Sequence, residues 1–320
     1  MAGRVGARQS QTAGDCTCCR VCSAGPHPHG GLLSGQARWL PLLTLIILPA
    51  VQSCRADAVG VPPSPSVVPP ASSPIASQSA ATAYWIPSPG TTWQWQLTEL
   101  PVDLTVEADA YDLDLLDTDL ETITALHAAG KKVICYISAG SWEDWRPDAA
   151  AFPQDVIGAR YQGWPGERWL DIRQIDLLAP IMSARLSLCR EKGFDAVEPD
   201  NIDGYTNDTG FAITYEEQLR YNRWLAGEAH ALGLSIGLKN DPEQAAELVA
   251  DFDWSLTEDC FDQGWCDSLA PFLEAGKAVL AAEYTDTGVD FEEACAELEP
   301  AGFSLILKDR ALSAWQETCR

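Results

Sequence analysis

Helix-like segments that end in glycine alternate with short apolar runs through most of this chain of 320 residues. Five such segments end at a glycine that an apolar or β-branched run follows within a few residues: Gly130, Gly193, Gly233, Gly276 and Gly302. Glycine is expected just past a helix end, where the backbone turns left-handed. Repeated changes from helix to strand predict parallel strands with helices between them, and therefore an α/β fold.

Eight short runs are predicted to be strands from their apolar and β-branched content. They cover residues 93–97, 110–114, 132–138, 194–200, 235–239, 252–258, 278–284 and 304–308. About 240 residues beyond the N-terminal segment suit one (β/α)8 TIM barrel, which we predict. A ninth run, 168–173, lies between the third strand and its helix at 176–192, and we expect it to be an extra strand inserted near the barrel mouth.

The N-terminal segment lacks the pattern of a folded domain. Residues 40–53 form an apolar run that is short for a membrane span, so we predict a signal or lipoprotein-type leader over 1–54. A lipoprotein would be anchored through Cys54, and an ordinary signal peptide is the alternative. Residues 55–82 are rich in Pro, Ser and Ala and predict an extended linker. The catalytic barrel is then expected over 83–320.

A group of cysteines and histidines lies upstream of the leader's apolar run and could suggest a zinc site. Its members are Cys16, Cys18, Cys19, Cys22, His27 and His29. The surrounding sequence is rich in Gly, has no apolar period, and precedes a segment that export would remove. We therefore favour a start codon assigned too far upstream over a metal domain.

Acidic residues outnumber basic ones strongly, with 46 against 21 in the chain. The first 82 residues hold two acidic and five basic side chains, so the remainder has 44 acidic and 16 basic ones. Without basic patches, nucleic-acid binding is disfavoured. The charge fits either simple solubility or a cationic substrate that the protein's field attracts.

Polar and charged side chains occupy nearly every predicted strand end. The strand at 194–200 ends in Asp200, and the strand at 252–258 ends in Glu258. The carboxyl ends of barrel strands meet at one rim, where active sites form. Two carboxylates there are the minimum equipment for cleaving a glycosidic bond. Asp200 and Glu258 are therefore the predicted catalytic pair.

Motifs for other chemistries are missing from the sequence. There is no Gly-x-Ser-x-Gly elbow, phosphate-binding glycine loop or dinucleotide fingerprint, so we predict no cofactor. His127 and His230 fall near helix ends, and a histidine-ligated metal is not expected. A carboxylate Mg²⁺ or Ca²⁺ site around Asp200, Asn201 and Asp203 stays open as an alternative to the prediction of no metal, although the spacing departs from a Ca²⁺ loop.

Several of the twelve tryptophans are predicted in loops near strand ends: Trp142, Trp145, Trp164, Trp169 and Trp265. Indole rings beside carboxylates stack on sugar faces and bind cationic groups. Packing that anchors the loops is the alternative explanation for about half of them.

The chain from 84 to 320 resembles glycoside hydrolase family 114, the endo-α-1,4-polygalactosaminidases. The resemblance rests on residues 93–97, 111–114, 133–140, 167–173, 192–203, 237–240 and 283–284. It implies an eight-fold barrel with an inserted strand and a catalytic Asp and Glu after the fourth and sixth strands, at Asp200 and Glu258. It also implies a polycationic substrate of α-1,4-linked galactosamine, which favours the cationic-substrate interpretation of the acidic charge over simple solubility.

We therefore expect a secreted or surface-tethered, monomeric glycoside hydrolase that cleaves galactosamine-rich polysaccharide internally. Asp200 is predicted to be the nucleophile of a retaining reaction, and Glu258 the general acid with a raised pKa. Lys239 should neutralise Asp200 or Glu198. The predicted substrate-binding residues are Asp112, Asp114, Tyr136, Asp171, Asn201, Asp203, Lys239, Glu283 and Tyr284. A non-catalytic carbohydrate-binding barrel, or a glycosidase for another α-linked sugar, are the alternatives.

Six cysteines lie in the predicted barrel, and export makes disulfides plausible. Cys260 and Cys266 flank a short loop after the strand of Glu258, so we expect them to pair. Three pairs are expected in all: Cys260 with Cys266, Cys295 with Cys319, and Cys135 with Cys189. Membrane contact is expected only through a lipid on Cys54.

Overall fold

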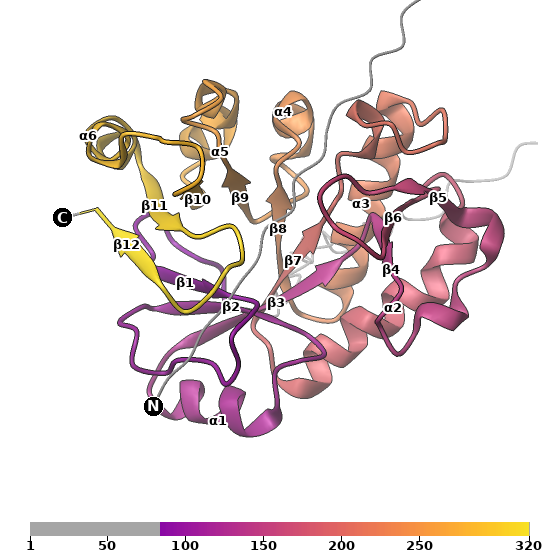
Figure 1. Cartoon of the computed structure of the whole chain (residues 1–320), viewed down its shortest axis with the longest axis horizontal. Helices are drawn as coiled ribbons and strands as arrows, with labels where there is room; N and C mark the ends of the chain where they lie inside the picture. The colour runs from indigo at the N-terminus through magenta and orange to yellow at the C-terminus, as the bar shows by residue number, and fades with distance from the viewer. Residues whose placement is uncertain (1–83, 320) are drawn as a thin grey trace, which may run out of the picture. The chain divides into compact units, whose positions relative to one another are not determined.

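The computed structural model describes residues 84–319 (Figure 1). Eight strands lie parallel and in sequence order: β1 (Trp93–Gln96), β2 (Ala110–Asp114), β3 (Lys132–Ser138), β7 (Ala196–Asp200), β8 (Ser235–Lys239), β9 (Trp254–Glu258), β10 (Val279–Tyr284) and β11 (Phe303–Lys308). A ninth, β12 (Gln316–Thr318), pairs antiparallel with β11. All eight predicted strands are confirmed, and the fold is α/β.

The sheet curves into a nearly closed barrel, and polar side chains join its first and last parallel strands. The indole N–H of Trp93 donates to the backbone oxygen of Ser304 at 2.9 Å. The ammonium of Lys308 donates to Oε1 of Gln94 at 3.0 Å. The predicted first strand is one residue too long, since the N–H of Leu97 leaves the ladder and donates to Leu312.

Helices surround the strands (Figure 1). They are α1 (Leu120–Ala128), α2 (Ile175–Lys192), α3 (Tyr215–Ala231), α4 (Ala245–Leu248), α5 (Ala270–Glu274) and α6 (Phe291–Ala301). Side chains fix several helix starts. Thr214 and Glu217 form a reciprocal capping box on α3, in which each side chain accepts from the other's backbone N–H. All five glycines at the predicted helix ends have a positive φ, from 69° at Gly276 to 105° at Gly302.

An inserted sheet fills the long connection from β3 to α2. Its strands are β4 (Ser141–Glu143), β5 (Ile157–Arg160) and β6 (Glu167–Leu170), in the antiparallel order β4-β6-β5. The predicted extra strand is therefore one of three. Short 3-10 turns complete the loops: Ala149–Ala151, Gln154–Val156, Gly204–Thr206, Pro242–Gln244 and Cys266–Leu269.

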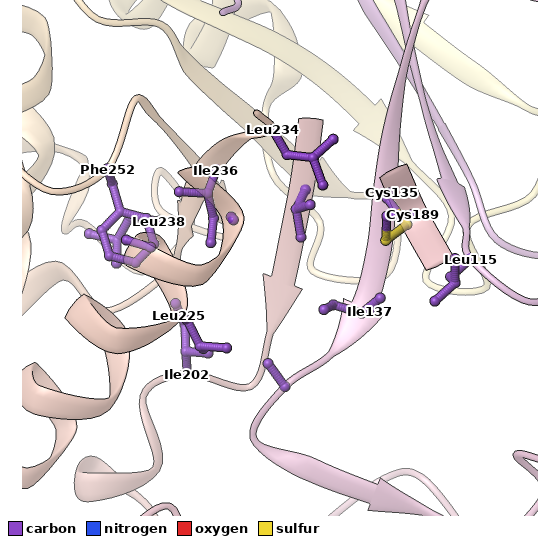
Figure 2. Close-up of a cluster of buried hydrophobic side chains, with 14 of the residues drawn as sticks. Leu115, Cys135, Ile137, Cys189, Ile202, Leu225, Leu234, Ile236, Leu238 and Phe252 are labelled. Atoms are coloured by element: carbon purple, nitrogen blue, oxygen red, sulfur yellow. A yellow bond between two sulfur atoms is a disulfide. The ribbon is translucent and has the colours of Figure 1, made fainter. Parts of the chain in front are cut away.

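The core has two layers because neighbouring strand residues face opposite sides of the barrel wall. Trp95, Ile134 and Trp254 belong to a cluster inside the barrel. Cys135 and Ile137 belong to the outer layer, where Figure 2 shows them with Ile236, Leu238 and helix residues. Parallel strands covered on both faces explain why the strand runs are almost continuously apolar.

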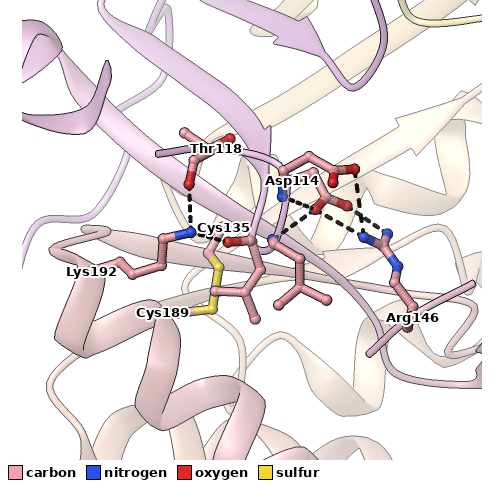
Figure 3. The surroundings of a disulfide bond; sticks show 9 residues. Asp114, Thr118, Cys135, Arg146, Cys189 and Lys192 are labelled. Atoms are coloured by element: carbon pink, nitrogen blue, oxygen red, sulfur yellow. Dashed lines mark hydrogen bonds and ion pairs between the residues drawn. A yellow bond between two sulfur atoms is a disulfide. The ribbon is translucent and has the colours of Figure 1, made fainter. Parts of the chain in front are cut away.

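The three expected disulfides are all present. Cys135 on β3 is joined to Cys189 on α2, which fastens the helix to the outer face of the barrel (Figure 3). Cys260 pairs with Cys266 after β9, and Cys295 on α6 pairs with Cys319 at the C-terminal end.

The predicted leader, the possible lipid site at Cys54, the upstream cysteine cluster and the linker over 55–82 lie outside the described residues. Within residues 84–319, no helix is both long and apolar enough to cross a membrane.

Candidate active site

A cleft of about 920 Å³ opens at the carboxyl ends of the barrel strands. Asp200 ends β7 and Glu258 ends β9, and both line the cleft. Tyr136, Asn201, Lys239 and Tyr284 also line it. The two predicted catalytic residues therefore line one cleft.

Lys239 joins the two predicted catalytic residues. Its Nζ lies 2.7 Å from Oδ1 of Asp200 and 3.1 Å from Oε2 of Glu258. A third carboxylate, Glu198, lies beneath it, with Oε1 at 2.8 Å from the same nitrogen. Burial opposes the charge of Lys239, but the surrounding carboxylates outweigh burial and raise its pKa well above the ordinary value.

Further donors fix the two carboxylates from opposite sides. The hydroxyl of Tyr136 donates to Oδ2 of Asp200 at 2.9 Å. Glu258 accepts from the hydroxyl of Tyr284 and, at 3.2 Å, from the amide of Asn240. The floor is the ring of Trp95, whose centroid lies 4.8 Å from Nζ of Lys239. These groups hold both acids in one geometry.

The expected raised pKa of Glu258 is wrong for this arrangement. Burial favours the neutral form, but the ammonium of Lys239 and the hydrogen bonds from Tyr284, Lys239 and Asn240 favour the carboxylate more. The pKa of Glu258 is therefore lowered. The sequence showed neighbouring carboxylates but not that Lys239 and Tyr284 would both contact this one.

Asp112 and Glu198 form a buried carboxyl pair one layer below the cleft. If both were ionised, both oxygens of Asp112 and Oε2 of Glu198 would lack a hydrogen-bond donor. Burial, the charge of Glu198 and a hydrogen bond to it raise the pKa of Asp112 well above its ordinary value. A proton on Asp112, donated to Glu198, would satisfy both groups and leave Glu198 charged beneath Lys239.

Three residues predicted to bind substrate do not line the cleft. Asp112 lies two residues before the end of β2, which is about 6.6 Å deeper along the strand, so the layer of side chains above it covers it. Glu283 faces away from the barrel interior and accepts from the backbone N–H groups of Phe261 and Asp262. Asp171 forms an ion pair with Arg173, with 2.6 Å between Oδ1 and Nε.

Asp114, Asn201 and Asp203 lie at the cleft as expected. Asp114 is paired with Arg146, whose Nη1 donates to Oδ1 at 2.9 Å (Figure 3). The side chain of Asn201 turns behind the cleft wall and donates to Oγ of Ser138 at 3.0 Å. Burial and the charge of Asp200 raise the pKa of Asp203 to about 6.

Sequence reasoning missed several cleft residues that come from loops and from the inserted sheet: Arg146, Tyr161, Glu167, Tyr205, Asp241, Glu243 and Arg310. Their positions depend on the paths of loops, which cannot be predicted from the residues at the strand ends. Glu167 is the first residue of the segment 167–173, which resembles the family. That resemblance was the only sequence signal that could have pointed to Glu167. Among the predicted tryptophans, Trp145, Trp164 and Trp265 line the cleft, whereas Trp169 is buried against Tyr161.

Acids outnumber bases around the cleft, with ten acidic and three basic lining residues. Arg146, Lys239 and Arg310 pair with the carboxylates nearest to them. Four lining carboxyl groups have no cationic side chain within 4.0 Å among the described residues: Glu167, Asp203, Asp241 and Glu243. The cleft thus has places for positive charge that the protein itself does not fill.

The two histidines of the barrel pair with carboxylates away from the cleft: His127 with Asp195 and His230 with Asp253, each at 2.9 Å. Among residues 84–319, no three histidine, cysteine or acidic side chains are arranged to hold a metal ion. Asp200, the first residue of the alternative metal loop, is engaged by Lys239 and Tyr136.

Comparisons with known proteins agree with this geometry. Ega3 of Aspergillus fumigatus, solved in complex with galactosamine, is 39% identical with a TM-score of 0.69, over 73% of this chain and 97% of that one. The glycoside hydrolase domain of PelA from Pseudomonas aeruginosa has the same fold at 17% identity and a TM-score of 0.56, over 71% and 98%. No curated protein sequence matches the chain. The model of glycoside-hydrolase family GH114 matches residues 74–320. The chain is therefore a glycoside hydrolase that belongs to family GH114.

Proposed function

We propose that this enzyme cleaves α-1,4-linked, galactosamine-rich polysaccharide internally, with retention of configuration. The meeting of Asp200 and Glu258 at one lysine in an acidic cleft carries the proposal. The carboxyl groups without cation partners suit a polymer that bears ammonium groups. The galactosamine bound to the similar Ega3 agrees with this substrate class.

In the proposed reaction, Asp200 attacks the anomeric carbon while the bond to the leaving oxygen breaks. Glu258 gives its proton to that oxygen, and the sugar stays covalently bound to Asp200. Glu258 then takes a proton from water, the water oxygen attacks the anomeric carbon, and Asp200 is released.

The separation of the carboxylates supports retention. One oxygen of each lies within about 3 Å of Nζ of Lys239, so these oxygens lie within roughly 6 Å of each other. That favours the shorter carboxyl spacing, about 5–5.5 Å, of retaining enzymes over the spacing of about 6.5–9.5 Å that accommodates an attacking water.

The site of action is proposed to be extracellular or at the cell surface. The apolar run at 40–53 and three disulfides in the barrel both suit an exported protein. We expect a monomer, because one chain contains the whole cleft. Size-exclusion chromatography with light scattering tests this expectation.

Incubation of the full chain with polygalactosamine, galactosaminogalactan and chitosan tests the activity. Mass spectrometry should show internal cleavage of the galactosamine-containing polymers, and NMR should show α-anomers as first products. Asp200→Asn serves as the inactive control. Binding without products would favour the non-catalytic alternative, preferred cleavage of chitosan would exclude the α-galactosamine assignment, and β-anomers would exclude retention.

A further inference from the structure

Glu167 is a buried carboxyl group at the cleft wall that no cation of the described residues neutralises. The inserted sheet carries it on β6, and it is 8% exposed. It lines the main cleft and also a second hollow of about 440 Å³, and Trp164 lines both as well. A carboxyl group in such surroundings requires either a proton or a bound cation.

The side chain of Glu167 is held from one side only. Oε1 accepts from the hydroxyl of Ser141 and, at 3.1 Å, from Nδ2 of Asn201. The same amide nitrogen lies 3.0 Å from Oγ of Ser138, which fixes its orientation. Oε2 receives no hydrogen bond from the described residues and is free to accept one from a ligand.

This network connects Glu167 to the residue that follows the proposed nucleophile. Asn201 directly follows Asp200 and has a left-handed backbone, with φ 64°. Its carbonyl packs so closely on Gly140 that a Cβ there would lie 1.6 Å away. In a 2-amino sugar the amine is on the carbon next to the anomeric carbon. Glu167 lines the same cleft as Asp200, and the charge of Asp200 acts on it, so a sugar amine next to the carbon under attack can be met by Glu167.

The charges around Glu167 leave it without compensation. Asp200 on β7 and Glu143 on β4 face it and raise its pKa, while Arg146 opposes them. Arg146 is already paired with Asp114 at 2.5 Å and with Glu143 at 2.8 Å. The phenol groups of Tyr136 and Tyr161 also face it. Burial is the largest cause, and the pKa rises to about 7.

We propose that Glu167 selects the free amine of the sugar unit bound next to Asp200. This rests on the proposed function and goes beyond it by naming the residue that distinguishes amine from N-acetyl. The ammonium would donate to Oε2 and supply the missing positive charge. An N-acetyl group is neutral and larger, so it leaves the buried carboxylate uncompensated.

The test compares matched α-1,4-linked oligosaccharides with free amines or full N-acetylation. Glu167→Gln, made in the full chain, keeps the shape but removes the charge. It should lower the ratio of kcat/KM for amine over N-acetyl substrate by about tenfold or more, mainly through a higher KM for the amine. Glu274→Gln, an exposed acid on α5, removes the same charge from the surface and should leave the ratio unchanged.

An unchanged ratio in folded Glu167→Gln, or an equal loss on both substrates, overturns the inference. If the variant does not fold, the wild-type enzyme provides a second test. Its preference for amine should rise between pH 5 and pH 6.5, as Glu167 begins to lose its proton while the sugar amine stays protonated, and a constant preference overturns the inference. Failure of the wild type to cleave either oligosaccharide would instead overturn the proposed function.

Discussion

Nζ of Lys239 lies 2.7 Å from Oδ1 of Asp200, which makes this buried ammonium the electrostatic centre of the cleft. Lys239 ends β8, the strand between those that end in Asp200 and Glu258, so it can contact both acids. The ion pairs hold both carboxylates in place at the cleft.

Replacement of Lys239 should remove both activity and stability. Lys239→Met leaves Asp200 and Glu198 without their cation, which should lower kcat by about 10²–10³ and the free energy of unfolding by about 3 kcal/mol or more. Lys131→Met, whose ammonium pairs with exposed Glu107 at 3.6 Å, is the control and should lower neither. Steady-state kinetics and urea denaturation measure the two effects. Near wild-type kcat in Lys239→Met would refute the central role.

The two proposed catalytic carboxylates should be required for turnover but not for binding. Asp200→Asn and Glu258→Gln keep side-chain size and remove the nucleophile or the proton donor, so each should lower kcat by about 10³ or more. Polymer binding, measured by affinity electrophoresis, should persist because several sugars share it. Full activity in either variant would exclude that residue from the mechanism.

The lowered pKa of Glu258 predicts an acidic optimum. A general acid works when protonated, and a lowered pKa means that the proton is lost at a lower pH than in free glutamic acid. The rate kcat/KM should therefore fall as pH rises from acidic values toward neutrality. Tyr284→Phe removes a hydrogen bond to the carboxylate and should shift this fall to higher pH. Tyr215→Phe, whose hydroxyl bonds to a backbone oxygen, should leave it in place.

Gly140 should be required at the β3–β4 turn. A Cβ there would meet the carbonyl of Asn201 at 1.6 Å, so Gly140→Ala must displace the residue that follows Asp200. We expect a loss of about 1–3 kcal/mol in unfolding free energy and a larger fractional loss of kcat. Gly227→Ala in α3 has open space around its Cβ and should stabilise by roughly 0.5–1 kcal/mol. Equal melting temperatures for the two variants would contradict the contact.

The disulfides should differ in what they stabilise. Cys135–Cys189 spans 54 residues and should contribute about 4 kcal/mol, whereas Cys260–Cys266 spans six and should contribute about 2 kcal/mol. Double alanine variants, followed by thermal denaturation, should show this order. Loss of the shorter bridge should still lower kcat/KM, because Trp265 in its loop lines the cleft. Unchanged activity there would show that the loop holds its shape without the bridge.

Much of the fold followed from local sequence signals. Glycine caps and apolar runs identified eight strands in their correct order, because α-to-β transitions leave a local trace. Once the strands were identified, Asp200, Glu258 and Lys239 could be placed at one rim, because the carboxyl ends of parallel barrel strands meet there. Two cysteine pairs could be proposed because they flank a predicted strand or the loop after one, and Cys135 with Cys189 was the pair that remained.

Side-chain depth and charge pairing were decided only by the tertiary structure. Asp112 and Glu283 occupy strand ends as the sequence indicated, but the pleat buries one beneath the cleft and turns the other away from it. The pKa of Glu258 depends on contacts with Lys239 and Tyr284, which come from other strands. Glu167 reaches the site through a folded insertion. Such contacts join residues far apart in the chain, and no local pattern of the sequence encodes their distances.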